Sequence, residues 1–98
     1  MKFIQTIEYT TSRIDEVIAT LDEWLAATKG KRTAGSGRLL RDRDRANTYV
    51  DVVEFPSYEE AMKNSDLPET AEISEKMAKL CDGPPTFRNL DVIHEFNG

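Results

Sequence analysis

Apolar side chains occupy both faces of the strand predicted over residues 48–55. Successive side chains of a strand point to opposite faces of the sheet, so Val50 and Val52 share one face and Val53 and Phe55 the other. A sheet that is apolar on both faces needs cover on both. The chain has only 98 residues, which suits one domain and leaves little room for a second. We therefore predict one domain whose sheet is covered by helices on one face and by a second copy of the chain on the other.

The spacing of apolar residues predicts three further strands. Residues 2–10 alternate as a half-buried strand does, and residues 38–41 and 48–55 flank a polar turn as the two strands of a hairpin do. A last strand is predicted over residues 86–96, where the imperfect alternation suggests a bulge.

A first helix is predicted between the first two strands. Ser12 can accept free amide hydrogens at the start of this helix while Asp15 reaches back, and the helix should end near Gly30. Its apolar positions recur at helical spacing, as in Ile14, Val17, Ile18, Leu21, Trp24 and Leu25.

Two short helices should follow the hairpin. Ser57 with Glu60 forms a capping-box pattern that predicts a helix fraying near residues 64–66. Pro68 suits the first turn of another helix, which should stop before Gly83.

The resulting order, βαββ(αα)β, predicts an α+β fold, the ferredoxin-like βαββαβ sandwich, as a single domain over residues 1–98. Two such sheets closing on each other would form a dimeric α+β barrel. RNA-recognition motifs share this order, but their third strand needs stacking aromatics. Residues 48–54 carry two carboxylates and one aromatic instead, which argues against RNA binding.

The composition excludes several classes of partner. Thirteen Lys and Arg against 18 Asp and Glu give a net charge of −5, so no general positive field attracts nucleic acid or an anionic membrane. With only one cysteine, Cys81, and one histidine, His94, the chain has neither an internal disulfide nor a His/Cys zinc set. No apolar run approaches the roughly 20 residues of a membrane span. We expect a cytoplasmic protein without a metal.

The basic segment, residues 29–45, is the clearest charge asymmetry. It holds seven of the 13 Lys and Arg and only two acidic residues. It can attract an anionic substrate to a pocket mouth, or it is simply a solvated loop and hairpin.

Three motifs resemble the dimeric α+β barrel superfamily and, within it, the antibiotic biosynthesis monooxygenase-like group. They are VEFPSYEEA at residues 53–61, PET at residues 68–70 and PTFRNLDV at residues 85–92. The resemblance implies a homodimer and one of three activities: cofactor-free oxidation of aromatic polyketides or quinols, polyketide cyclisation, or haem degradation. Haem-degrading members place a tryptophan where Phe55 stands and a histidine near Asn64, so the resemblance argues against haem.

Asp51, Tyr49 and His94 are candidate catalytic residues. Asp51 and Tyr49 share a strand face expected to look toward the helices, where desolvation would raise the pKa of the Asp51 carboxyl and make it a base. The alternative is a pairing of Asp51 with Arg38 or Arg41 across the strands. His94 is the only side chain with an ordinary pKa near neutrality, and its alternative role is a polar strand edge or dimer contact.

A fourth candidate catalytic residue, Gln5, can orient a substrate carbonyl or phenol through its amide. Tyr9 can supply a hydroxyl at the pocket rim, and Trp24 and Phe55 are candidates for the pocket wall. Gln5 and Tyr9 can instead satisfy backbone groups, and Trp24 can instead pack in the core.

We therefore expect a homodimer that binds a small aromatic or polyketide-like molecule and, as the resemblance implies, oxygenates or cyclises it without a cofactor. Asp51 or His94 would remove a proton, and Gln5 and Tyr49 would stabilise the resulting oxyanion. The alternative is a non-catalytic dimeric binding or scaffold domain. A cavity of about 300 Å³ or more would favour the first hypothesis.

Overall fold

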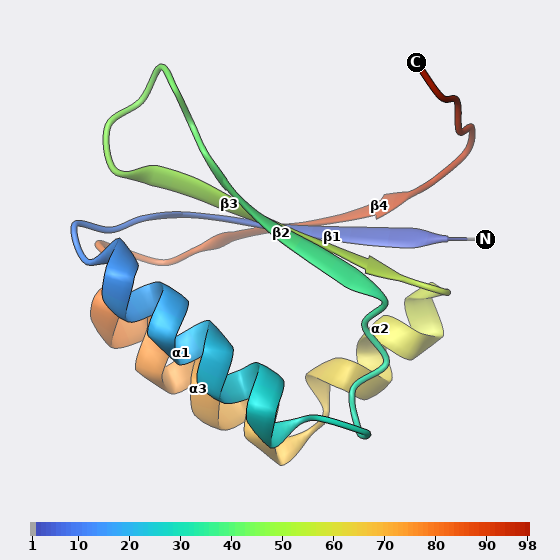
Figure 1. The fold of residues 1–98 in the computed structure, drawn as a ribbon, viewed down its shortest axis with the longest axis horizontal. Helices are drawn as coiled ribbons and strands as arrows, with labels where there is room; N and C mark the ends of the chain where they lie inside the picture. Colours follow the sequence, from blue (N-terminus) through green and yellow to red (C-terminus); the bar gives the residue numbers. More distant parts are fainter. Residues whose placement is uncertain (1) are drawn as a thin grey trace.

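Four antiparallel strands form one sheet in the order β2-β3-β1-β4, and three helices lie on one of its faces (Figure 1). This arrangement is seen in a computed structural model that describes residues 2–98. The strands are β1 (Phe3–Thr10), β2 (Ser36–Arg41), β3 (Thr48–Phe55) and β4 (Thr86–Asp91), and the helices are α1 (Ile14–Ala27), α2 (Tyr58–Ser65) and α3 (Pro68–Leu80). The predicted ferredoxin-like α+β sandwich is confirmed.

The β2–β3 hairpin is also confirmed, although β2 begins at Ser36, two residues before the predicted start. The extension has a local cause, because the Gly35 amide donates to the Glu54 carbonyl at 2.8 Å and leads the chain into the ladder. Within the sheet, β1 lies between β3 and β4, with Ile7 opposite both Asp51 and Phe87.

The predicted strand parity holds in β3. Tyr49, Asp51 and Phe55 are buried on the face toward the helices, while Val50 and Val52 lie on the other face and stay half-exposed. We call this second side the open face, because no helix covers it among residues 2–98 (Figure 1).

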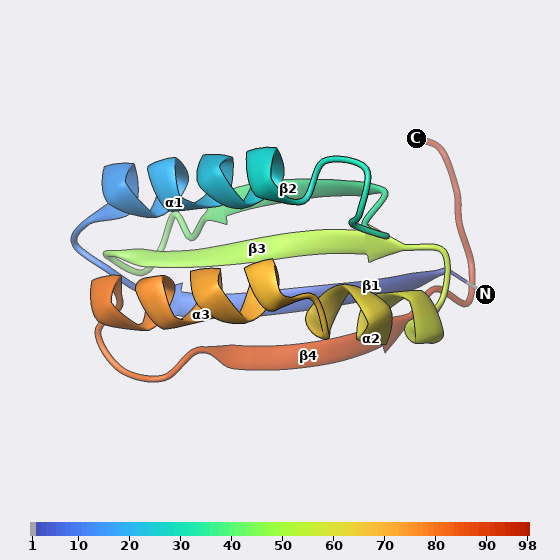
Figure 2. The ribbon, with the colours of Figure 1, turned by 90° about the horizontal axis from the view of Figure 1, so that it is seen from below.

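Two apolar clusters fill the layer between the sheet and the helices. The first surrounds Tyr9, Val17 and Tyr49, and side chains from α1 and α3 cover it. The second surrounds Phe3, Phe55 and Ala61, beneath α2. Figure 2 shows α1 and α3 running alongside each other over the sheet, with α2 continuing beyond the start of α3. No helix in the described part of the chain is both long and apolar enough to span a membrane.

The two short helices begin as predicted. The Ser57 hydroxyl accepts a hydrogen bond from the Glu60 amide at 3.2 Å, which satisfies one of the free donors in the first turn of α2. Pro68 occupies the first turn of α3, where a missing amide hydrogen costs nothing.

The predicted cap at Ser12 is wrong. Helix α1 begins after Arg13 without a side-chain cap, and Ser12 is exposed. The fully buried Thr11 takes the local role instead, because its hydroxyl accepts from the Arg13 amide at 3.0 Å and donates to the Leu80 carbonyl at 2.6 Å. The helix ends at Ala27, and Gly30, with a φ of 83°, turns the chain three residues later.

The predicted last strand is too long. Strand β4 ends at Asp91, opposite the first residue of β1, Phe3. The Val92 amide still donates to the Lys2 carbonyl at 3.0 Å, after which the chain leaves the sheet on the side away from the helices (Figure 1). Residues 92–98 therefore form an irregular C-terminal segment, and the expected bulged strand up to Phe96 is not formed.

Replacing Ser57 by alanine tests the cap of α2. Ser57→Ala removes the acceptor of the Glu60 amide and should lower the free energy of unfolding by about 1 kcal/mol. The matched control is Ser12→Ala, which removes an exposed hydroxyl and should change it by less than about 0.5 kcal/mol. Urea denaturation of both variants measures the difference, and equal losses would contradict the assignment of the caps.

Candidate functional site

A buried pair of polar side chains, Tyr9 and Asp51, lies in the layer between sheet and helices. The Tyr9 hydroxyl donates a hydrogen bond to Oδ1 of Asp51 at 3.1 Å. Both side chains are nearly sealed from solvent, with 4% of Tyr9 and 8% of Asp51 exposed. Tyr9 stands opposite Tyr49 in the β1–β3 ladder, so the hydrogen bond runs diagonally to the residue two places along β3.

The surroundings of this pair are apolar. The centres of the Tyr9 and Tyr49 rings lie 6.4 Å apart. Apolar side chains from both helices and from the neighbouring strands surround these rings: Ile7 of β1, Leu39 of β2, Ile14, Val17 and Leu21 of α1, Met77 and Leu80 of α3, and Cys81 directly after α3.

The predicted alternative for Asp51, an ion pair with Arg38 or Arg41, is wrong. Arg38 stands opposite Val52 and so points to the open face, and Arg41 stands opposite Tyr49. The residue directly opposite Asp51 on β2 is the apolar Leu39. None of the ion pairs formed among residues 2–98 includes Asp51.

Tyr9 and Asp51 are buried without a neighbouring cation, and this raises the pKa of both side chains. Loss of solvation raises the pKa of Asp51 from 3.8 to about 6, and the hydrogen bond from Tyr9 offsets part of this rise. Burial and then the nearby Asp51 charge raise the pKa of the Tyr9 phenol well above its ordinary value. Burial likewise raises the pKa of the Cys81 thiol, so this cysteine is not an activated nucleophile. Of these three groups, Asp51 is thus the one that can accept a proton near neutral pH.

Gln5 lies on the same face of β1 as Tyr9, but further along the strand. Four residues separate them, which corresponds to about 13 Å. The Gln5 amide nitrogen donates to Oδ1 of Asn89 on β4 at 3.3 Å, near solvent. Gln5 is the other diagonal neighbour of Asp51 on β1, on the far side of Ile7 from Tyr9, but its amide donates to Asn89 on the neighbouring strand.

Trp24 and Phe55 lie in two different places. Trp24 is half-buried, its indole nitrogen donates to Oγ1 of Thr70 on α3 at 3.0 Å, and the Arg32 guanidinium sits 5.9 Å from the centre of its ring. Phe55 is 3% exposed and packs against Phe3 in the cluster beneath α2. Neither side chain belongs to the cluster around Asp51.

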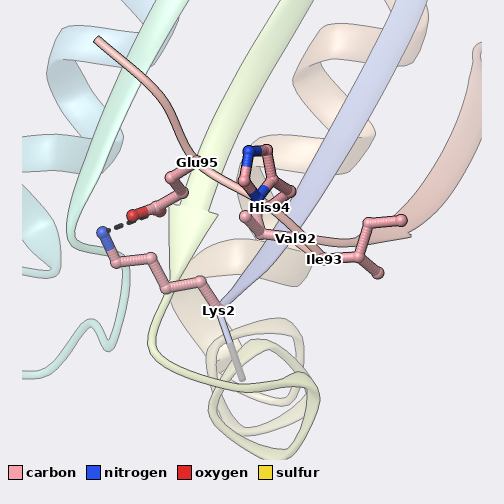
Figure 3. Close-up of a pocket in the computed structure, with 5 residues that line it drawn as sticks. All are labelled: Lys2, Val92, Ile93, His94 and Glu95. Carbon is pink, nitrogen blue, oxygen red and sulfur yellow. Dashed lines mark ion pairs between the residues drawn. The ribbon is translucent and has the colours of Figure 1, made fainter.

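His94 lies far from Asp51, in the C-terminal segment. It lines a hollow of about 310 Å³ with Lys2 and three neighbours from its own segment (Figure 3). Val92 bonds to Lys2 whereas Asp51 pairs with Ile7, so the two sites are about 17 Å apart along β1. A second hollow, of about 340 Å³, lies on the open face, and neither hollow is lined by Asp51.

Asn64, near the end of α2, is a buried polar residue that the sequence pattern did not single out. It is 6% exposed, and its side-chain oxygen accepts from the Thr33 amide at 3.2 Å. Its carbonyl accepts from the Thr70 hydroxyl at 2.9 Å, and Thr70 accepts in turn from Trp24. This chain of bonds joins all three helices to the loop before β2. An asparagine near the expected fraying end of a short helix gives no sequence signal of such burial.

The described residues show no arrangement suited to a metal, since no three His, Cys, Asp or Glu side chains within residues 2–98 are grouped to hold an ion.

Solved structures of other proteins match the fold over almost the whole chain. SnoaB, a cofactor-independent oxygenase from Streptomyces nogalater solved as an asparagine-to-alanine mutant, aligns with a TM-score of 0.83 over 99% of this chain and 98% of that chain, at 13% identity. Rv0793 from Mycobacterium tuberculosis aligns with a TM-score of 0.79 over 99% and 100% of the two chains, at 14% identity. A candidate antibiotic biosynthesis monooxygenase from Caulobacter crescentus gives 0.81 over 95% and 91%, at 12% identity.

The chain has the fold of the antibiotic biosynthesis monooxygenase-like proteins. No protein-family model matches the sequence, and no curated protein matches it either. The resemblance read from the three sequence motifs is thus confirmed at the level of the fold. In this monooxygenase-like fold, the Tyr9–Asp51 pair occupies the layer between sheet and helices.

The raised pKa of Asp51 predicts how stability depends on pH. The folded protein holds the Asp51 proton up to about pH 6, whereas the unfolded chain releases it near 3.8. The folded state therefore binds more protons between these values, and the free energy of unfolding falls as the pH rises through them. A shift of about two pH units corresponds to about 3 kcal/mol.

Asp51→Asn keeps an acceptor for the Tyr9 hydroxyl and removes this titration. The variant should match the wild type at pH 4 and exceed it by up to about 3 kcal/mol at pH 7.5, measured by urea denaturation. Tyr9→Phe, which removes the hydrogen bond that favours the charged carboxylate, should make the fall with pH larger. A difference between Asp51→Asn and the wild type that stays constant with pH would refute the assignment.

Proposed function

We propose that the protein binds a small aromatic or polyketide-like molecule in the layer between sheet and helices and oxygenates or cyclises it without a cofactor. The observation that carries the proposal is the Asp51 carboxyl, which is desolvated, free of any cation and held by Tyr9. A base with a pKa near 6 is mostly ionised at pH 7 and ready to take a proton. The shared fold with SnoaB, described as a cofactor-independent oxygenase, supports this choice.

The proposed reaction starts with removal of a proton from an activated phenol or carbon acid by Asp51. Tyr49, on the same face of β3, and Gln5, on β1, would stabilise the oxyanion by hydrogen bonds. In the oxygenation, dioxygen is the oxidant: a CH₂ group becomes a carbonyl, one oxygen atom stays in the product, and the other leaves as water with the two hydrogens. In the cyclisation, the carbanion attacks a carbonyl of the same molecule and no oxidant is needed.

The geometry ranks the candidate residues. Asp51, Tyr9 and Tyr49 lie together, so they form the centre of the proposed site. His94 lies two residues beyond Val92, which bonds to Lys2 about 17 Å along β1 from Ile7, the residue opposite Asp51. His94 and Asp51 of the same chain are therefore assigned to different sites. Trp24 and Phe55 lie outside the apolar cluster around Tyr9, Val17 and Tyr49. They would contact only a ligand that extends beyond this cluster, toward α2.

A second candidate function is a non-catalytic binding or scaffold domain. The observation that favours it is the apolar packing around Tyr9 and Tyr49 beside Asp51, together with the fact that Asp51 lines neither of the hollows of about 310 and 340 Å³. A substrate site around Asp51 requires Leu21, Met77 or Leu80, which are only half-buried, to move aside.

The proposal also includes a homodimer in which the open faces of two copies cover each other. Val50, Val52 and Ile4 lie on this face and are half-exposed in the single chain. A cytoplasmic location is part of the same proposal, since the lone Cys81 leaves no internal disulfide.

Oxygen uptake with dithranol, a tricyclic phenolic anthrone, tests the oxygenase. The wild type should consume oxygen above the uncatalysed rate, with activity rising through about pH 6 as Asp51 ionises. Asp51→Asn should lower kcat by about 10² to 10⁴-fold, the usual contribution of a general base. Asp44→Asn, in the exposed β2–β3 turn, is the matched control and should keep full activity.

Three outcomes count against parts of this proposal. Equal activity of Asp51→Asn and wild type would exclude Asp51 as the base, and a loss in His94→Ala alone would transfer that role to His94. If neither oxygen uptake nor saturable binding of aromatic acids is detected, the scaffold function replaces the enzymatic one.

Sedimentation velocity at micromolar concentration tests the homodimer. The wild type should sediment with twice the chain mass of 11.1 kDa. Val52→Glu places a charge in the middle of the open face and should give single chains that keep a native circular dichroism spectrum. Ile18→Glu, an exposed apolar position on α1, is the matched control and should leave the mass unchanged. Single wild-type chains at this concentration would contradict the dimer.

A further inference from the structure

Arg41, the last residue of β2, lies beside the candidate site on the face of the sheet toward the helices. It stands opposite Tyr49 on β3, and Tyr49 stands opposite Tyr9 on β1. Residues directly opposite each other in an antiparallel pair share a face, so these three residues form one row across three strands. Asp51 belongs to the next row and is diagonal to Arg41, with about 7 to 8 Å between their Cα atoms.

The Tyr49 hydroxyl is available to a ligand. Only 8% of Tyr49 is exposed, and its hydroxyl bonds to no other residue among 2–98. Every fully buried polar side-chain atom in this part of the chain has a hydrogen-bond partner, so the Tyr49 hydroxyl lies within reach of solvent. The row therefore leads from an exposed arginine, through a hydroxyl in contact with solvent, to the buried Tyr9–Asp51 pair.

Arg41 has no counterion. It is exposed, and none of the ion pairs formed among residues 2–98 includes it. The carboxylates of Asp42 and Glu8 are both engaged with Arg45, at 2.8 and 3.1 Å. A guanidinium offers two parallel donors that match a carboxylate, so an arginine without a partner can bind an anion from solution.

The fold separates Arg41 from the other six basic residues of the segment 29–45. Three of them bond to groups of α1, α3 and β1, namely Arg32, Lys31 and Arg45. Arg38 stands opposite Val52 and points to the open face. Lys29 follows the end of α1, and Arg43 lies in the β2–β3 turn. The positive charge of this segment therefore meets the candidate site at Arg41.

We propose that Arg41 binds the carboxylate of an aromatic acid and so selects anionic over neutral aromatic substrates. The ring of the substrate then lies toward Tyr49, with the proton to be removed at the Asp51 carboxyl. This inference rests on the proposed function and names its substrate class. A half-buried side chain such as Leu21 or Met77 still has to move to admit the ring, whereas Arg41 is exposed and can hold the carboxylate at the surface.

Equilibrium binding of two matched compounds, measured by isothermal titration calorimetry at pH 7.5, tests the inference. The first is 6-hydroxy-2-naphthoic acid, and the second is 2-naphthol, which has the same rings without the carboxylate. The wild type should bind the acid about tenfold more tightly than the naphthol. Arg41→Gln should lower this ratio of affinities about tenfold, because it removes charge-assisted hydrogen bonds. Arg41→Lys keeps the charge but not the planar fork and should give an intermediate ratio.

The matched control is Arg43→Gln, which removes the same charge from an exposed position two residues away and should keep the wild-type ratio. An equal fall of the ratio in both glutamine variants would show that only the general field of the segment attracts the acid, and it would overturn the contact with Arg41. A ratio near one in the wild type would overturn it as well, and so would the binding of neither compound.

Oxygen uptake with dithranol, which has no carboxylate, separates this inference from the proposed function. Oxidation of dithranol that depends on Asp51, without a preference for the acid, would overturn the role of Arg41 and leave the oxygenase standing. A preference for the acid that depends on Arg41, without oxygen uptake, would support the contact and exclude the oxygenase. Failure of both measurements would overturn both proposals.

Discussion

The covering of only one face of the sheet determines most of what this molecule shows. Four strands in the order β2-β3-β1-β4 present two faces, and the three helices described among residues 2–98 cover one of them. Tyr9, Tyr49 and Asp51, at odd-numbered positions of β1 and β3, are consequently buried, while Val50 and Val52, at even-numbered positions, keep contact with solvent. The same division places Asp51, the acidic residue of the candidate site, inside and leaves Val50 and Val52 on the open face.

Burial of the Asp51 side chain makes its carboxylate a stronger base. A carboxylate of ordinary acidity would be a weak base at neutral pH, and a carboxylate paired with arginine would be weaker still. In this fold Arg38 points to the open face, Arg41 stands opposite Tyr49, and the apolar Leu39 stands opposite Asp51. None of the ion pairs described among residues 2–98 includes Asp51. Only the hydrogen bond from Tyr9 stabilises the negative charge of Asp51, and this effect is smaller than that of burial, so the pKa of Asp51 rises. Structural likeness to monooxygenase-like proteins at 12 to 14% identity concerns the fold, and the case for chemistry rests on this carboxyl.

The sequence predicted those features that depend on neighbouring residues. The parity of β3, the Ser57 cap and the Pro68 helix start follow from local spacing, and all three are present. The end of β4 depends on where its partner begins, because Asp91 pairs with Phe3 and no strand remains to pair with residues beyond it. The alternation up to Phe96 could not reveal this. Thr11 replaced Ser12 as the local acceptor because it reaches Leu80, which is 69 positions away.

In the candidate site, too, the contacts between residues distant in the sequence could not be predicted. Asp51 was recognised on an apolar face, but its partner could not be chosen, since that required the register between β1 and β3. The register places Tyr9 diagonal to Asp51 and moves it from the expected rim into the interior. His94 and Trp24 were grouped with Asp51 by chemical type, and their separation from it in space is a property of the topology.

A nuclear magnetic resonance titration of the Asp51 side-chain carboxyl carbon shows directly whether burial raises the pKa of this group. We expect a midpoint near pH 6, with the chain folded throughout the titration. A midpoint near the ordinary value of 3.8 would show that Asp51 is solvated or paired with a cation, and Asp51 could then not be the proposed base.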